Sequence, residues 1–331
     1  MKNDNKKSNK KMKDKIKKYL NKNRLLILLV LVCIANVIML GFFIHDNRRI
    51  NKLINEEEKY ELKNKKLSEE NSELLKRLEK QNKRIEIGKD GMATKIPIIT
   101  FHRTVDSETK KKYFKDSEWV NDLSVTESEL KYLYDNGWKT IDLDEFYCWY
   151  NKDCEFPVKT FAITIDDGDS EAYYNILPIL EKYGFDATLF SIGVAIPDKT
   201  EPLNEPKRQK LGYDIIKELR DKKSLLQVES HSYDLHHLVG KKEAVLTKTY
   251  EELQEDFKSN EKFEFKYIAY PYGVYNKKML QATSNSNIKM AFKFKKGTYA
   301  TRLDNKYEIA RIKVNSYMNL DDFKKIFDYE K

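Results

Sequence analysis

From residue 95 onwards, short apolar runs alternate with segments that carry the apolar spacing of amphipathic helices. Such alternation is typical of parallel sheets, because two parallel strands need a crossover connection between them. The length fits one barrel-like domain. We therefore predict an α/β domain over residues 95–331, with its parallel sheet open or closed into a barrel. The predicted strands are Ile96–Phe101, Phe161–Ile165, Ala187–Ile192, Leu225–Glu229 and Tyr267–Tyr270, and the predicted helices are Thr126–Asn136, Ser170–Tyr183, Leu211–Asp221 and Thr247–Ser259.

Side chains that can bind a metal or move a proton follow three of these apolar runs. Asp166 and Asp167 follow one run, His102 follows another, and His231 lies just past a third. In barrels and open α/β sheets, active residues sit beyond the carboxyl ends of the strands. A single such residue is ordinarily a helix cap or a satisfied buried polar group. Three together favour a functional site.

Three of the five histidines fall in one short stretch, HSYDLHH at His231–His237. Two imidazoles and one carboxylate, with an open position for water, form a recurring catalytic zinc set. A divalent ion lowers the pKa of its bound water, and a neighbouring carboxylate can take the proton. The adjacent Asp166 and Asp167 suit this division, with one carboxylate as ligand and the other as base.

Three motifs occur in order: TIDDG at Thr164–Gly168, HSYDLH at His231–His236 and YPYG at Tyr270–Gly273. Together they resemble the first three motifs of the polysaccharide deacetylases, the NodB-homology or family-four carbohydrate esterases. PIITFHR, at the start of the domain, resembles the first strand and histidine of many members. The resemblance covers roughly residues 95–320. It implies a distorted (β/α) barrel of the NodB-homology type.

The resemblance also implies a role for each motif. Asp167, His231 and His236 would hold a divalent metal, usually Zn²⁺, and Asp166 would be the general base. The backbone N–H of Tyr272 would stabilise the oxyanion. A metal-activated water would attack the acetamide carbonyl of an N-acetylglucosamine polysaccharide, releasing acetate. The residues expected to contact the substrate are Tyr270, Pro271, Tyr272 and Gly273.

The histidine spacing departs from the pattern of most members, which place the two ligands four residues apart. Here the spacing is five, which separates two side chains on a regular helix by about 140°. We therefore expect His231 in the loop after the strand and His236 at the start of a helix. The longer spacing resembles the branch that acts on biofilm poly-N-acetylglucosamine. His237 is a rival ligand.

Two further departures concern the base and the acid. The family's arginine before the third motif, which orients the base, is replaced by Ala269, and Arg302 or Arg311 could substitute. The C-terminal Leu-x-His motif, source of the general acid, is absent. His102 is our candidate for that acid, and a histidine packed beneath the barrel mouth is the alternative. Asp169 is interpreted as a helix N-cap.

The N-terminal part of the chain reads as a membrane anchor followed by a stalk. Leu25–Ile44 is an uncharged run long enough to span a bilayer, and it lacks the small-x-small cleavage site of the alternative, a signal peptide. The Lys-rich residues 1–24 then predict a cytoplasmic N-terminus and an extracellular catalytic domain. Residues 45–90 are charged and free of proline. We predict a helical stalk, either a solvated spacer or a parallel homodimeric coiled coil with Leu53, Tyr60, Leu67 and Leu74 at d positions.

The basic net charge of +9 does not indicate a nucleic-acid partner. Residues 1–24 alone carry that excess, and the rest of the chain is neutral, so the basic charge belongs to the tail.

Cys148 and Cys154 would lie outside the cell, where a disulfide is permitted. The alternatives to poly-N-acetylglucosamine deacetylation are the same chemistry on peptidoglycan, or a catalytically impaired glycan-binding module.

Overall fold

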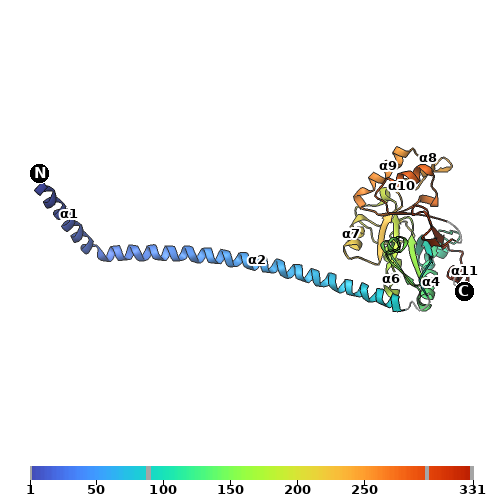
Figure 1. Cartoon of the computed structure of the whole chain (residues 1–331), viewed down its shortest axis with the longest axis horizontal. Coiled ribbons are helices and arrows are strands. Elements are labelled where there is room, and N and C mark those ends of the chain that lie inside the picture. Colours follow the sequence, from blue (N-terminus) through green and yellow to red (C-terminus); the bar gives the residue numbers. More distant parts are fainter. Residues whose placement is uncertain (1, 87–90, 295–297, 329–331) are drawn as a thin grey trace. The chain divides into compact units, whose positions relative to one another are not determined.

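The computed structural model describes residues 2–86, 91–294 and 298–328. The chain divides into two compact units, residues 1–80 and 81–331, and each is described by itself. The first unit consists of helix α1 (Lys2–Lys22) and most of helix α2 (Arg24–Glu86), which Figure 1 draws in blue. The helical prediction for the stalk is confirmed as far as Glu86, and residues 87–90 lie outside the described part of the chain.

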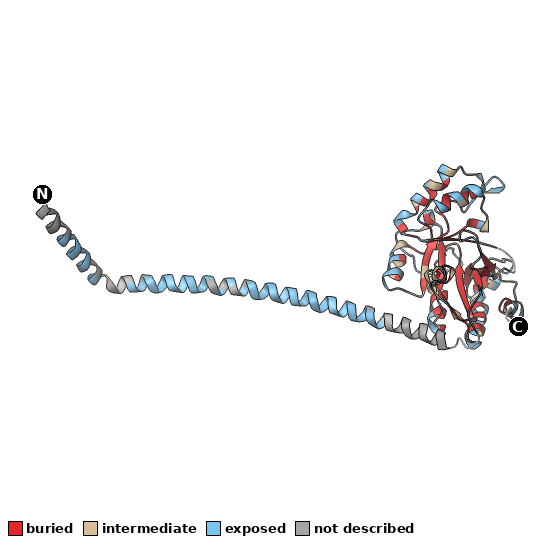
Figure 2. Ribbon diagram, viewed as in Figure 1, coloured by how far each residue is buried: buried red, intermediate tan, exposed pale blue. Residues whose placement is uncertain are grey.

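Helix α2 runs without a break through the apolar segment Leu25–Ile44 and the charged segment after it. Across the described residues, no helix meets the combination of length and apolar character that crossing a membrane requires. The predicted span is therefore without support from the structure. In Figure 2 the described part of α2 is exposed throughout. The d-position residues Leu53, Tyr60 and Leu67 are among its exposed side chains. The side chain of Leu74 lies outside the described residues.

The second unit is built around a closed parallel sheet, which confirms the predicted barrel. Within the described residues, seven strands pair in a ring, and the last pairs with the first through Ile98↔Ala162 to Phe101↔Ile165. A further short strand, β5 (Lys139–Thr140), pairs with β6 on its other edge. In ring order the strands are β2 (Ile98–Phe101), β14 (Ile309–Lys313), β12 (Met290–Phe294), β11 (Tyr267–Ala269), β8 (Leu226–Ser230), β7 (Ala187–Ser191) and β6 (Thr160–Ile165).

Pairing around the barrel is uneven. Strands β7 and β8 pair at five positions, from Ala187↔Leu226 to Ser191↔Ser230, whereas β8 and β11 pair at Ile268↔Ser230 alone. The barrel is distorted at this seam, as expected. Two-stranded sheets accompany the barrel. They pair β1 (Lys95–Ile96) with β13 (Ala300–Thr301), β3 (Arg103–Val105) with β4 (Val120–Asp122), and β9 (Leu238–Val239) with β10 (Lys242–Glu243).

Several helices begin at side-chain caps that the sequence supplies. Asp142 forms a capping box with Glu145, and Thr249 forms one with Glu252. The predicted helix from 170 to 183 is a π-helical turn, Ala172–Ile176, that continues as α6, and Gly184 ends it at φ 64°. The α-helices described in the second unit are α3 (Ser107–Tyr113), α4 (Leu123–Asp135), α5 (Leu143–Tyr150), α6 (Leu177–Tyr183), α7 (Tyr213–Asp221), α8 (Ala244–Thr247), α9 (Tyr250–Ser259), α10 (Lys277–Ser284) and α11 (Leu320–Lys325).

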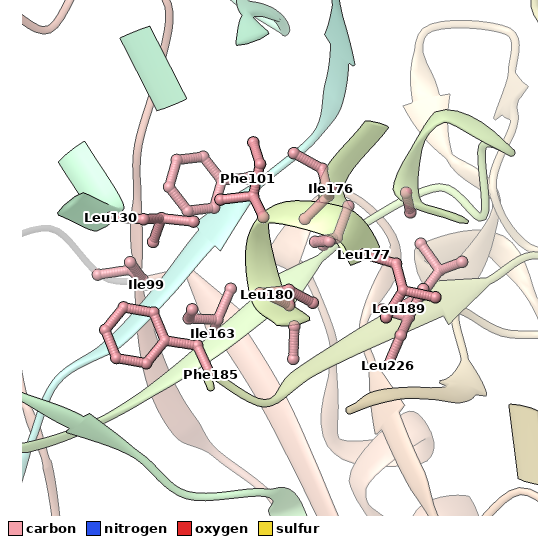
Figure 3. Close-up of a cluster of buried hydrophobic side chains, with 14 of the residues drawn as sticks. Ile99, Phe101, Leu130, Ile163, Ile176, Leu177, Leu180, Phe185, Leu189 and Leu226 are labelled. Carbon is pink, nitrogen blue, oxygen red and sulfur yellow. The ribbon is translucent and has the colours of Figure 1, made fainter. Parts of the chain in front are cut away.

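Both faces of the barrel strands are buried, which is why they read as continuous apolar runs. On one face, Ile99, Phe101 and Ile163 pack with Leu130 of α4 and Leu180 of α6 (Figure 3). Their direct chain neighbours Ile98 and Ala162 join a second cluster on the opposite face. The core thereby holds the strands rigidly, and with them the residues that follow each strand.

Candidate active site

One end of the barrel carries the polar residues that follow its strands. A cavity of about 470 Å³ opens there. The parallel direction of the strands explains the grouping, because their carboxyl ends meet at the same side of a barrel. The residues that line the cavity come from segments far apart in the chain: His102, Arg103, Phe114, Ser117, Trp119, Val120, Asp166, Asp167, Arg208, His231, His236, Tyr272 and Phe294.

Asp167, His231 and His236 meet in this cavity. Asp167 Oδ1 lies 3.3 Å from His236 Nε2 and 3.7 Å from His231 Nε2, and all three donors lie within 4.8 Å of one another. Four ligands at about 2.0–2.1 Å from a tetrahedral zinc are separated by roughly 3.3 Å. The types of donor, and the 3.3 Å and 3.7 Å separations from Asp167 Oδ1, therefore suit a divalent metal ion. His237, the rival ligand, faces Asp234 instead, at 3.7 Å.

Both imidazoles are held neutral, as ligation requires. Burial lowers the pKa of His231, and burial together with His231 lowers the pKa of His236. His231 Nδ1 donates to the carbonyl of Ala269 at 2.8 Å, which leaves the lone pair of Nε2 facing the cavity. Such a hydrogen bond on the second ring nitrogen fixes the orientation of a metal-binding histidine.

Asp166 is fully buried beside this set and is bound by Arg311 of β14. Arg311 Nη1 donates to Oδ1 at 2.6 Å, and Nη2 donates to Oδ2 at 2.9 Å. Burial alone would raise the pKa of Asp166, but Arg311 and the nearby His231 outweigh it and hold the pKa below its usual value. Of the two arginines considered in place of Ala269, Arg311 is the one that contacts Asp166. Arg302 binds Glu155, away from the cavity.

Gly168 allows the two aspartates to turn into the cavity. Asp167 has φ 80° and Gly168 has φ 74°, so two consecutive residues adopt left-handed conformations. A Cβ on Gly168 would lie 2.7 Å from Ser191 Oγ and 2.9 Å from Ser191 Cα. Glycine is therefore required both by the backbone conformation and by the close approach of β7.

His102 forms part of the cavity wall. Its ring lies edge-on to Trp119 with centroids 4.7 Å apart, and 6.1 Å from the centroid of Phe294. Burial lowers the pKa of His102, and Asp166 and Asp167 oppose that shift. His102 is buried and still lines the cavity, so the acid role and the packed alternative both stay open.

The Tyr270–Gly273 motif presents one side chain to the cavity. Tyr272 adopts φ 57°, and its exposed ring lies over His236 at a centroid distance of 4.4 Å. Tyr270 is fully buried and donates its hydroxyl hydrogen to the carbonyl of Tyr307. Pro271 is also buried, and Gly273 has φ 70° with Phe294 close to where a Cβ would stand. The structure thus places Tyr270 and Pro271 in support of Tyr272.

Comparison with known proteins identifies the family. The family profile described as polysaccharide deacetylase matches residues 154–291. A poly-beta-1,6-N-acetyl-D-glucosamine N-deacetylase of Staphylococcus aureus is 31% identical over 217 residues, which cover 61% of this chain and 72% of the relative. This chain belongs to the polysaccharide deacetylase family. The predicted family and enzyme class are confirmed.

Solved structures agree on the deacetylase fold. A Streptococcus pyogenes deacetylase in complex with acetate aligns with a TM-score of 0.57 at 19% identity, over 71% of this chain and 99% of that one. A de-N-acetylase from Aggregatibacter actinomycetemcomitans aligns with a TM-score of 0.59 at 19% identity, over 70% and 99%. His102 and Arg311 lie outside the segment that the family profile matches.

Two expectations about the deacetylase site are wrong. His236 does not begin a helix, because it lies in the irregular loop between β8 and the β9–β10 hairpin. Asp169 does not cap a helix with its side chain. Instead its carboxylate accepts hydrogen bonds from Arg208 and Lys210, at 2.8 Å and 2.7 Å. For Asp169, these tertiary contacts take the place of the local cap.

Sequence reasoning missed several residues of the deacetylase cavity, among them Arg208, Trp119 and Phe294. None lies in a motif or directly after a predicted strand, so no local pattern distinguished them. The disulfide was left open, and the structure bonds Cys148 to Cys154. It closes the end of α5, where Arg302 also donates to the carbonyl of Cys154.

Proposed function

We propose that this chain removes acetyl groups from a poly-N-acetylglucosamine polysaccharide with a bound divalent cation, most simply Zn²⁺. The observation that supports the proposal is the meeting of Asp167, His231 and His236 beside the buried, arginine-bound Asp166. A purely glycan-binding module would have no use for this combination. The intact donor set therefore argues against the impaired alternative.

Asp167 Oδ1, His231 Nε2 and His236 Nε2 would hold the cation. A bound divalent cation supplies Lewis-acid chemistry, polarising a carbonyl and lowering the pKa of water. Asp166 is ionised and adjacent, with Oδ2 4.0 Å from His231 Nε2, and would accept the proton of the attacking water. Arg311 keeps this carboxylate in one orientation through the two hydrogen bonds that it donates.

His102 and Tyr272 would act on the other side of the reacting carbonyl. The N–H of Tyr272 would donate to the developing oxyanion. The proton that Asp166 would take from the water would return to the leaving nitrogen with His102 as the donor, so that the C–N bond breaks to a free amine and acetate. The rings of Trp119 and Phe294 pack against His102 and hold its imidazole at the cavity wall. The exposed ring of Tyr272 offers a face on which a sugar can stack.

The name of the Staphylococcus aureus relative and the five-residue histidine spacing both favour a β-1,6-linked substrate. The test is acetate release from β-1,6-linked and β-1,4-linked N-acetylglucosamine oligomers and from peptidoglycan, with added zinc. We expect the highest kcat/KM on β-1,6-linked oligomers and complete loss after chelation. A higher kcat/KM on peptidoglycan would identify the cell wall, rather than poly-N-acetylglucosamine, as the substrate. Zinc binding without acetate release from any of the three would favour a binding module.

We further propose that the chain is anchored by Leu25–Ile44 with the deacetylase domain outside the cell. The support is the uncharged run and the Lys-rich segment before it. The test is cell fractionation with protease added to intact cells. Recovery in the membrane fraction, with domain cleavage by external protease, is expected. Recovery in the soluble fraction contradicts the anchor.

Chemical cross-linking of the same cells tests for the stalk homodimer.

A further inference from the structure

Arg208 lies in the long segment between β7 and α7 and is fixed against the turn that carries the metal-binding aspartate. Two backbone hydrogen bonds join the segments, Ser170 N–H to Gln209 carbonyl at 2.9 Å and Leu211 N–H to Gly168 carbonyl at 3.0 Å. Asp169 and Lys210 form an isolated bridge between them. The backbone on both sides of Arg208 is therefore held in register with Asp167–Asp169.

The guanidinium of Arg208 binds two carboxylates at once. Nε donates to Asp169 Oδ1 at 2.8 Å, and Nη2 donates to Asp169 Oδ2 and to Asp167 Oδ2, each at 2.9 Å. Asp169 is buried, and Lys210 Nζ donates to its Oδ1 as well, at 2.7 Å. Asp169 therefore anchors the planar guanidinium, and the guanidinium in turn holds Asp167.

The two oxygens of Asp167 face different partners. Oδ1 faces both imidazoles, at 3.3 Å and 3.7 Å, while Oδ2 accepts from Arg208. We propose that Arg208, anchored by Asp169, is a positioning residue that reserves Oδ2 and presents Oδ1 alone to the metal. This inference rests on the metal site of the proposed function. It makes the aspartate after Gly168 part of the metal site without being a ligand.

The charge of Arg208 works against its positioning effect, which makes the inference testable. A cation beside the site repels a divalent ion, so simple loss of positive charge should tighten zinc. Loss of a group that orients a ligand weakens metal binding, typically 10- to 100-fold. Lys207 is a matched control, because it is on the same segment, carries the same charge and pairs with Glu201 rather than with the site.

The experiment loads the full chain with zinc and measures zinc release to a chromogenic chelator, together with a metal-edge X-ray absorption spectrum. We expect release from Arg208→Gln to be about 10- to 100-fold faster than from wild type, with altered zinc–oxygen distances. Lys207→Gln should be unchanged or slower. Zinc release from Arg208→Lys should be faster than from wild type, as it is from Arg208→Gln, because an ammonium lacks the planar array of donors. Asp169→Asn should also be faster, and its effect should not add to that of Arg208→Gln.

Two outcomes separate this inference from the function on which it rests. If wild type binds zinc through Asp167, His231 and His236 but Arg208→Gln releases it no faster than Lys207→Gln, the positioning role is wrong and the deacetylase proposal stands. If wild type binds no zinc, both are wrong. Circular dichroism and thermal melting of every variant show whether faster release reflects misfolding.

Discussion

Arg311 holds Asp166 through two hydrogen bonds, one to each carboxylate oxygen, although 145 residues separate them along the chain. Both side chains are almost completely buried, and the Nε of Arg311 has no partner in the described residues. A buried pair of this kind adds little net stability, since desolvation offsets the attraction, but losing one partner leaves an uncompensated charge. The pair therefore matters chiefly for the charge state and orientation of Asp166.

Replacing Arg311 with lysine tests this interpretation. Arg311→Lys keeps the charge but loses the bidentate geometry, so we expect kcat to fall by about 10²-fold or more, the lower range for an acid–base residue. Zinc content should be unchanged, because Arg311 touches no ligand. Arg302→Lys is the matched control, since it alters an arginine–carboxylate pair outside the cavity. Equal kcat in the two variants would show that Arg311 does not support Asp166 in catalysis.

Removing the charge of Asp166 separates the base from the ligand. Asp166→Asn preserves the shape but cannot accept a proton, so we expect kcat to fall by about 10²–10⁴-fold while zinc still binds. Asp167→Asn, the adjacent change, should instead lose zinc. Acetate release and metal content measured on the same samples distinguish them. Retained activity in Asp166→Asn would exclude this residue as the base.

The meeting of the sequence motifs in one cavity could be predicted because their signal is local. Asp166, Asp167 and His231 each follow an apolar run that the pattern identifies as a strand, and parallel strands bring their ends together. The arginine that contacts Asp166 could be narrowed to two candidates, Arg302 and Arg311. The sequence did not decide between them, because strand β14 was not predicted and no local feature separates Arg311 from Arg302. Arg208 gave no signal at all. Its partners are set by how a long loop lies against a distant turn.

His231 and His236 should be necessary for zinc, and His237 should not. We expect His236→Ala to weaken zinc binding at least 10-fold, because one of three protein ligands is lost. His237→Ala changes the next residue along the chain, which faces Asp234, and should bind zinc as wild type does. Competition with a chelator of known affinity measures both. Weaker zinc binding by His237→Ala than by His236→Ala would identify His237 as the ligand and contradict the proposed metal site.

Glu129 predicts how stability changes with pH. Burial in α4 raises its pKa to about 8, from an ordinary value of 4.5. The folded state therefore holds the proton of Glu129 at pH values where the unfolded state has released it. The stability that this proton provides is complete below pH 4.5 and is lost as pH rises to 8, at up to about 1.4 kcal/mol per pH unit.

Glu129→Gln removes this titration. We expect the variant to match wild type near pH 5 and to exceed its free energy of unfolding at pH 8, because an uncharged amide replaces a buried carboxylate. Urea unfolding at pH 5, 6, 7 and 8 measures the difference between the two proteins, so that other buried acids cancel. Glu127→Gln is the control on the same helix, because Glu127 pairs with Lys182 near the surface and its pKa is lowered. Parallel pH curves for Glu129→Gln and wild type would show that Glu129 does not hold its proton in the folded state.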